Sequence, residues 1–295
     1  MQRKVVILGG AGQLGIELCR EFANRNWTVD RFDRQSLDVT DPQRVEAAIA
    51  EADPQLVVNA AAYNQVDIAE SEPAAAFQAN SLAVRSLAMA CRQVDACLVH
   101  YSTDYVFDGT KGSSYVETDM PHPLGAYAVS KLAGEFYAQA YLDNALIIRT
   151  CGVFGPEGMF TARGNFVEFM LRLAKSGTPI RVVQDHVASP TYAPAIAACT
   201  ADMVEKNMAG LFHMGGGQPI SWYDYAKLIF EVAGLSPSLT ATNEKEYRTA
   251  ARRPKFSALS NSKLEAAGIA RMPSLRAAVE DYFARREEAI ARRSL

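Results

Sequence analysis

The sequence predicts an α/β fold, a Rossmann-type doubly wound parallel sheet joined to a smaller C-terminal domain. Short, continuous apolar runs alternate with longer helical patterns through about the first 150 residues, as expected for a parallel sheet covered by helices on both faces. A glycine-rich turn stands directly between the first apolar run and the first helical pattern, where dinucleotide-binding folds place theirs. Beyond residue 152 the alternation loosens, which indicates a second unit.

The first strand is expected at residues 4–8, a β-branched apolar run that enters the turn Gly9-Gly10-Ala11-Gly12-Gln13-Leu14-Gly15. Glycines at positions 9, 12 and 15 let the chain turn tightly, approach a pyrophosphate and pack the following helix against the strand. The helix N-terminus then faces the phosphate charge. A glycine triplet alone is a weak signal, but its place between a strand and a helix makes it a specific one.

The second strand, at residues 27–32, ends at Asp33, about where a Rossmann acid meets the adenosine ribose. Arg31 and Arg34 flank this acid and are alternatives to it, because they would receive a 2′-phosphate instead. Asp38-Val39 then opens a loop. Two interpretations of Asp38 stay open: it serves the adenine side of a cofactor, or it only leads the turn.

The other elements of the first half repeat the strand–helix order. We expect helices at about 42–52 and 73–94 and strands at 56–59, 97–101 and 145–149. The small residues Ala60-Ala61-Ala62 follow the third strand. They suit either the close approach of a flat ligand at the carboxyl end of the sheet or simple helix–sheet packing.

Tyr127 and Lys131 stand four residues apart in a helical pattern, so their side chains share one face of the helix. A nearby ammonium lowers the pKa of a phenol from about 10 toward the range of a general acid. A tyrosine and a lysine at this spacing, without other motifs, usually mark only an exposed helix face. Here the segment Tyr101-Ser102-Thr103-Asp104-Tyr105 and the glycine turn precede it, and together they favour a catalytic pair.

The second half is less regular. Glycines and a proline mark a loop at 152–164 that we expect to be mobile above the site. Helices are expected at 166–175, from 221 and from 274, and strands at 180–183 and 211–214. The basic cluster Arg252-Arg253-Pro254-Lys255 suits a diphosphate or a solvated loop equally well on charge alone. We expect residues 1–151, with roughly 178–214, to form the dinucleotide-binding domain, and roughly 152–177 and 215–295 to form the second one.

Composition excludes several classes of function. The 295 residues carry a net charge of -3 without a basic block, so neither nucleic acid nor an anionic membrane is an expected partner. The five cysteines have no C-x-x-C spacing and the four histidines no metal spacing, so we expect free thiols and no metal site. The sequence shows no signal peptide and no apolar run of about 20 residues, so the expected location is the cytoplasm.

The chain resembles the extended short-chain dehydrogenase/reductases, and among them the dTDP-4-dehydrorhamnose reductase family. The matching segments occur in order along essentially the whole chain. They are GGAGQLG from Gly9, NAAAYNQVDIAESEP from Asn59, HYSTDYVFDG from His100, YAVSKLAGE from Tyr127, NFVEFMLRLA from Asn165, SPTY from Ser189 and ARRPKFSALSNSKLEAAG from Ala251.

The resemblance implies NADPH- or NADH-dependent reduction of the 4-keto group of a nucleotide-linked 6-deoxy sugar, most closely dTDP-4-dehydrorhamnose to dTDP-L-rhamnose, with a homodimer as an assembly to consider. It implies that Thr103, Tyr127 and Lys131 are catalytic, with Tyr127 the proton donor, and that Thr103, Asp104 and Arg253 meet the substrate. The implied cofactor residues are Gly9, Gly12, Gln13, Leu14, Gly15, Asp33, Asp38, Val39, Ala62, Tyr63 and Asn64, together with Tyr127 and Lys131.

The chain departs from the pattern of its relatives at two places. The first bears on the identity of the sugar, and the second on the alternative activities. Some relatives carry a sugar-stacking tryptophan where this chain has Gly152, and the loop 155–164 is longer and richer in glycine. Related dehydratases have an Asp-Glu pair where this chain has Asp104-Tyr105, so the base for elimination is missing. The alternatives are a nucleotide-sugar epimerase of the same fold and a non-catalytic NAD(P)-binding regulatory subunit.

Overall fold

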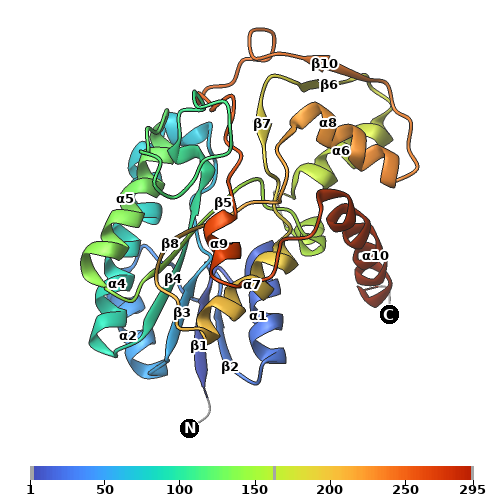
Figure 1. The fold of residues 1–295 in the computed structure, drawn as a ribbon. Helices are drawn as coiled ribbons and strands as arrows, with labels where there is room; N and C mark the ends of the chain where they lie inside the picture. Colours follow the sequence, from blue (N-terminus) through green and yellow to red (C-terminus); the bar gives the residue numbers. More distant parts are fainter. Residues whose placement is uncertain (1–2, 162–163, 294–295) are drawn as a thin grey trace.

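The central element of the computed structural model, which describes residues 3–161 and 164–293, is a six-stranded sheet in the order β2-β1-β3-β4-β5-β8 (Figure 1). Every neighbouring pair in it is parallel. Its strands are β1 (Lys4–Leu8), β2 (Thr28–Phe32), β3 (Leu56–Asn59), β4 (Cys97–Thr103), β5 (Leu146–Thr150) and β8 (Gly210–Met214). The order reverses at β1, so the crevice between the carboxyl ends of β1 and β3 is where such sheets bind ligands.

Helices cover both faces of this sheet, as the sequence predicts for a doubly wound fold. Helices α1 (Gln13–Asn24) and α7 (Ala193–Glu205) bury apolar residues on one face. On the other face lie α2 (Pro42–Ala52), α4 (Ala83–Gln93) and α5 (Ala126–Tyr141). The strands are continuous apolar runs because alternate residues enter two different cores: Val5 and Ile7 enter one, and Val6 and Leu8 the other.

The long helix expected at 73–94 is interrupted. It consists of α3 (Pro73–Phe77), a π-turn at Gln78–Leu82 and then α4. Asn80 of the π-turn accepts a hydrogen bond from the backbone N–H of Tyr63 (2.9 Å) and donates to the Tyr63 carbonyl (2.9 Å) and to Ser130 Oγ (3.0 Å). The wider turn thereby ties the loop after β3 to the helix α5.

A second lobe stands beyond the carboxyl ends of the strands (Figure 1). Its core joins α6 (Phe166–Ser176), α8 (Trp222–Val232), α10 (Leu275–Arg293) and the parallel pair β6 (Ile180–Val183) and β10 (Leu239–Thr242). We expected residues 178–214 to return to the Rossmann part. In fact β6 pairs in this lobe, and only α7 and β8 return to the sheet. The exact division into domains stays a prediction.

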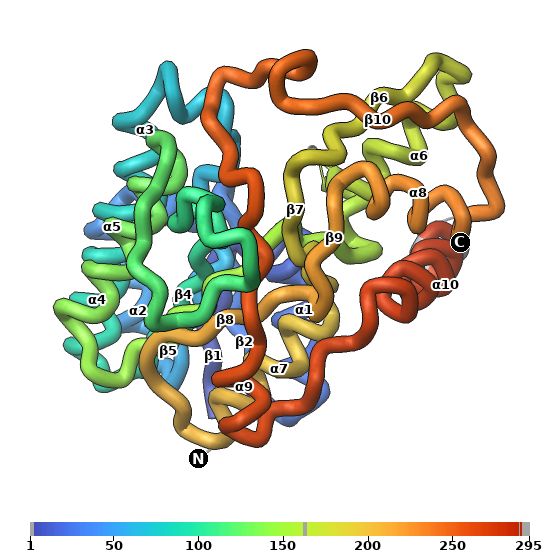
Figure 2. The backbone as a smooth tube through the Cα atoms, turned by 45° about the horizontal axis from the view of Figure 1, so that its top comes forward, coloured from blue at the N-terminus to red at the C-terminus, as the bar shows by residue number. Residues whose placement is uncertain are grey.

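The segment 249–260, which we call the strap, runs from the second lobe back to the first (Figure 2, orange). Two residues of the strap form β-bridges: Phe256 pairs with Val187, and Leu259 pairs with Tyr115. The strap then continues into α9 (Ser262–Ala266). Residue Val187 belongs to β7 (Val187–Ala188), which pairs with β9 (Ile220–Ser221). Among the described residues, no helix is both long enough and apolar enough to span a membrane.

Candidate active site

A cavity of about 480 Å³ between the lobes contains the expected catalytic hydroxyls. Thr103, the last residue of β4, and Tyr127, in the first turn of α5, both line it. Lys131 lies one turn further along α5, is only 3% exposed, and donates from Nζ to the Tyr101 carbonyl over 2.6 Å. The three residues therefore lie around the carboxyl end of β4, where the cavity begins.

Burial controls the charge of Lys131. Loss of solvent lowers the pKa of the ammonium to about 8, and Glu135 on the next turn opposes this decrease. The other titratable group near it, His100, is fully buried, and burial followed by the Lys131 charge lowers its pKa well below the usual value. His100 is therefore neutral, and Lys131 is the local positive charge below a pH of about 8.

The hydroxyl of Thr103 is held by its neighbours. Its Oγ1 accepts from the backbone N–H of Tyr105 (3.2 Å) and donates to Asp104 Oδ1 (3.2 Å). Asp104 is 3% exposed, and burial raises the pKa of its carboxyl to about 6. The ring of Tyr105 stands edge-on to that of Tyr127 with centroids 6.3 Å apart. This position, where a dehydratase would carry its glutamate, presents a phenol whose pKa burial raises further.

A second cavity, of about 660 Å³, lies over the glycine turn. Of the expected cofactor residues it is lined by Gly9, Gly12, Asp33, Asp38, Val39, Ala62, Tyr63 and Asn64. Asn64 also lines the catalytic cavity, so the two spaces adjoin. A cofactor that lay along both would reach from the turn to Tyr127.

The glycine turn fits a phosphate because side chains are excluded from it. Gly9 has a φ of +72°, and a Cβ there would lie 2.6 Å from the Ala61 backbone nitrogen. A Cβ on Gly15 would lie 2.2 Å from the Gly9 carbonyl oxygen, so Gly15 acts through packing rather than by lining the cavity. Leu14 likewise packs against the sheet core. No side chain caps the N-terminus of α1 at Gly12, so its first backbone N–H groups are available to an anion, as in other anion-binding turns.

Asp33, the acid at the end of β2, accepts hydrogen bonds within its own turn. Asp33 Oδ1 accepts from the backbone N–H groups of Gln35 (3.0 Å) and Ser36 (2.9 Å), and the Ser36 bonds lower its pKa. Arg34 is 90% exposed in its side chain and lies 3.6 Å from Asp38. Asp38 holds the turn through the Thr40 N–H (2.9 Å) and also lines the cavity, so both open interpretations of it agree with the geometry.

The side chain of Gln13 points away from the cofactor cavity. Its Nε2 donates to the Val153 carbonyl (2.9 Å), and its Oε1 accepts from Asn165 Nδ2 (3.2 Å). Asn165 also donates to the Gly155 carbonyl (3.0 Å) and caps α6. Val153 and Gly155 belong to the loop that was expected to be mobile, of which residues 162–163 lie outside the described part, and Asn165 directly follows that loop. Gln13 thus lines the catalytic cavity and fixes one of its walls.

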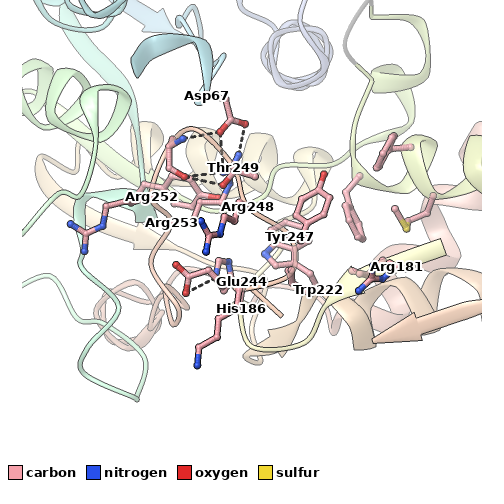
Figure 3. Close-up of a pocket in the computed structure, with 18 residues that line it drawn as sticks. Asp67, Arg181, His186, Trp222, Glu244, Tyr247, Arg248, Thr249, Arg252 and Arg253 are labelled. Atoms are coloured by element: carbon pink, nitrogen blue, oxygen red, sulfur yellow. Dashed lines mark hydrogen bonds and ion pairs between the residues drawn. The ribbon is translucent and has the colours of Figure 1, made fainter. Parts of the chain in front are cut away.

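A third cavity, of about 930 Å³, adjoins the catalytic one and is lined in part by residues of the strap (Figure 3). Tyr105, Phe166, Phe169 and Trp222 line both spaces. Five cations (Arg181, Lys245, Arg248, Arg252 and Arg253) line the third cavity, as do the carboxylates of Asp67 and Glu244. This excess of positive charge suits an anionic group such as a diphosphate.

Arg253 lines this cavity and forms an ion pair that fastens the strap to the first lobe. Its Nη1 and Nη2 donate to the two carboxylate oxygens of Asp67 over 3.1 and 2.7 Å, and the Ala251 N–H donates to the same carboxylate over 3.0 Å (Figure 3). Asp67 follows β3, so the pair joins the two lobes. An incoming diphosphate would meet Arg253 together with this partner.

Sequence reasoning missed the aromatic wall of the cavity. A Cβ on Gly152 would lie 3.1 Å from the indole of Trp222, and Gly152 has a φ of +48°. Trp222 therefore occupies space beside the position where some relatives carry their tryptophan. No local pattern marks Trp222, because it lies 70 residues further along the chain; the signal available was only an aromatic residue at a helix start.

Comparison with known proteins gives concordant results. Residues 3–288 match the family described as the RmlD substrate binding domain. The chain is 38% identical to dTDP-4-dehydrorhamnose reductase of Escherichia coli (strain K12), over 88% of this chain and 90% of that protein. It is 34% identical to the spore coat polysaccharide biosynthesis protein SpsK of Bacillus subtilis (strain 168), over 97% and 99%. The crystal structure of dTDP-4-dehydrorhamnose reductase from Bacillus anthracis in complex with NADP superposes with a TM-score of 0.92 at 33% identity, covering 97% of this chain and 100% of that one.

Proposed function

This chain belongs to the RmlD substrate binding domain family, and from that premise we propose that it reduces the 4-keto group of a nucleotide-linked 6-deoxy sugar with NADPH or NADH. The substrate favoured by its reductase relatives is dTDP-4-dehydrorhamnose, with dTDP-L-rhamnose as product. One observation carries the proposal: the cavity that contains Thr103 and Tyr127 joins a glycine-lined cavity on one side and a cation-lined cavity on the other.

The residues of the chain divide the work of a ketone reduction. The nicotinamide cofactor supplies the hydride. Tyr127 donates the proton to the oxygen that becomes an alkoxide, and the Thr103 hydroxyl hydrogen-bonds that oxygen. Protonated Lys131 favours the phenolate that Tyr127 leaves behind, because an ammonium in a low-dielectric site stabilises a nearby negative charge. Asp104 adds a second polar contact to the sugar.

Arg253 and its ion pair extend the proposal to the nucleotide. A planar guanidinium binds a diphosphate through paired N–H donors. In this chain one N–H of each Nη atom of Arg253 is bound to Asp67, so this ion pair orients the guanidinium and a diphosphate would meet its other N–H groups at the edge of the third cavity. We therefore assign the diphosphate to the strap side, with the sugar toward Tyr127.

The epimerase alternative receives less support from this site. An epimerase returns its hydride in each turnover, so it needs no net reductant, whereas several relatives that are 34–38% identical to this chain are named reductases. The regulatory-subunit alternative leaves Thr103, Tyr127 and Lys131 without a purpose. Both alternatives remain outcomes of the experiment below.

The test is the stoichiometry of cofactor consumption. Purified protein is incubated with a dTDP-4-keto-6-deoxy sugar and NADPH or NADH, and cofactor absorbance and sugar product are followed together. We expect one cofactor oxidised per sugar reduced. Sugar conversion without net oxidation would establish an epimerase, and cofactor binding without any conversion would establish a regulatory subunit.

We also propose a homodimer and a cytoplasmic location. Leu82, Val129 and Phe136 expose 42%, 40% and 59% of their surface at the π-turn and along α5, an apolar strip that a second copy would cover. All five cysteines are free, which suits a reducing compartment. Light scattering should give the dimer mass for the native chain and the monomer mass for Phe136→Glu; a monomeric native chain would refute the dimer.

A further inference from the structure

Behind the catalytic cavity lies a buried ion pair that lines none of the three cavities described above. Arg149 of β5 donates from Nε to Glu135 Oε1 (2.9 Å) and from Nη2 to Glu135 Oε2 (2.6 Å). The two side chains are 3% and 2% exposed. Taking two charges out of water is costly, and such a pair is often no more stable than apolar residues of similar volume. Stability alone therefore does not explain why the pair is there.

Further polar and aromatic side chains contact the Glu135–Arg149 pair. Ser102 Oγ donates a short hydrogen bond to Glu135 Oε1. The Arg149 Nη1 group lies 3.5 Å from His213 Nε2, and the guanidinium lies 5.2 Å from the Phe107 ring. His213 donates from Nδ1 to the Tyr115 carbonyl (3.0 Å), and burial and the Arg149 charge lower its pKa to about 3. His213 is thus a neutral acceptor, and Glu135 carries the compensating charge for Arg149.

The Glu135–Arg149 pair is connected to the reacting groups through helix α5 and through strand β4. Tyr127, Lys131 and Glu135 are spaced by four residues on α5, so they share one helix face. On β4, Ser102 stands between Tyr101, whose carbonyl accepts from Lys131, and the catalytic Thr103. Two consecutive contacts therefore fasten α5 to β4, one from Lys131 and one from Glu135. Arg149 fixes the second contact from the neighbouring strand.

We propose that Glu135 and Arg149 are positioning residues for the reaction, which hold α5 in register on β4 so that Tyr127 faces Thr103. This inference rests on the reductase function proposed above. Removing the pair should let α5 slide or tilt on the strand while the core stays closed. It also removes Glu135, whose negative charge raises the pKa of Lys131 against the effect of burial.

The decisive variant replaces the pair by apolar residues, Glu135→Leu with Arg149→Met, so that no buried charge is left unpaired. We expect this double variant to unfold in urea at or above the native midpoint and to bind NADPH within about threefold of the native affinity. Its kcat should fall at least about tenfold, with KM changed less. The basic limb of its kcat–pH profile should shift to lower pH, because without the carboxylate the buried ammonium loses its proton more easily.

A matched control pair lies in the second lobe. Arg286 donates from Nε to Glu168 Oε1 (2.6 Å) and from Nη2 to Glu168 Oε2 (3.2 Å), with both side chains at most 20% exposed. Glu168→Leu with Arg286→Met removes the same chemistry away from α5 and β4. We expect kcat and its pH limb to stay within about twofold of native there.

The results separate the possibilities. A stable Glu135→Leu/Arg149→Met variant with native kcat and a native pH limb would overturn the positioning role. If that variant does not fold, Ser102→Ala decides, because it removes the hydrogen bond between β4 and Glu135. Ser102 also lines the catalytic cavity, so reduced kcat with unchanged KM and cofactor affinity supports the proposal, and native kcat or a raised KM alone refutes it. A native chain that does not oxidise cofactor with the keto sugar would instead refute the proposed function.

Discussion

Replacing Gly134 by alanine should destabilise the protein, although helix propensity alone predicts the opposite. Gly134 lies in the middle of α5. At such a position alanine is worth about 1 kcal/mol more than glycine, because glycine loses more conformational freedom on folding. The added Cβ, however, would lie 2.2 Å from the Asn80 carbonyl oxygen of the π-turn and 3.3 Å from its carbon.

The steric cost can be worked out from that contact. An ordinary contact begins at 3.4 Å, so the two backbones must separate by 3.4 - 2.2 = 1.2 Å. The clashing atom belongs to the backbone, which cannot rotate away as a side chain would. Overpacking of this kind costs about 1–3 kcal/mol, and we take the upper end, about 3 kcal/mol. After the propensity gain of about 1 kcal/mol, the net loss is about 2 kcal/mol, or a Tm lower by about 4 °C.

The assay is urea unfolding followed by circular dichroism, with Ala140→Gly as the control. Residue 140 is exposed on the same helix, so that variant reports propensity alone and should lose at most about 1 kcal/mol. Gly134→Ala should also lower kcat, because separation from the π-turn displaces the helix that carries Tyr127. A Gly134→Ala protein as stable as the native one, or more so, would refute the reasoning.

Three further predictions concern the site. Tyr127→Phe should lower kcat by about 10²–10⁴-fold while cofactor affinity, measured by fluorescence titration, stays native; lost affinity would make the residue structural. Asp33→Ala should shift the ratio of kcat/KM values toward NADPH, because a carboxylate repels a 2′-phosphate; an unchanged ratio would show that Asp33 does not face the ribose. The pKa of Asp104 is raised to about 6, so its ionised form costs stability above that pH and costs none below about 4; Asp104→Asn should gain on the order of 2 kcal/mol in urea unfolding at pH 8 and little at pH 4, and equal gains at both would contradict this.

The parts of the fold that depend on local pattern were predictable. The parallel strands of the first half are apolar runs whose ends the structure reproduces closely, and the turn from Gly9 to Gly15 lies where its glycines require it. The spacing of Tyr127 and Lys131 also sufficed, because helical geometry alone brings them to one face. In each of these cases the physical cause lies within a few residues of the pattern.

Features that depend on distant partners were not predictable. Nothing near Ile180 shows that β6 pairs with β10 rather than with the central sheet, since both are apolar strand environments. The π-turn at Gln78–Leu82 arises from contacts of Asn80 with Tyr63 and Ser130, which lie far away in sequence. Likewise, Gln13 stands within a cofactor motif, yet its side chain binds Val153 and Asn165, because the second lobe brings those groups within reach.

The position of β8 has a consequence for how the protein folds while it is being synthesised on the ribosome. Strand β5 ends at Thr150, but its outer neighbour β8 begins only at Gly210, after the chain has passed through α6, β6 and α7. While those intervening residues are being synthesised, the nascent sheet presents an unpaired apolar edge, which can recruit strands from other chains. Chaperone capture during this interval would therefore protect the yield of protein, and truncation near residue 151 would leave the edge of β5 permanently unpaired.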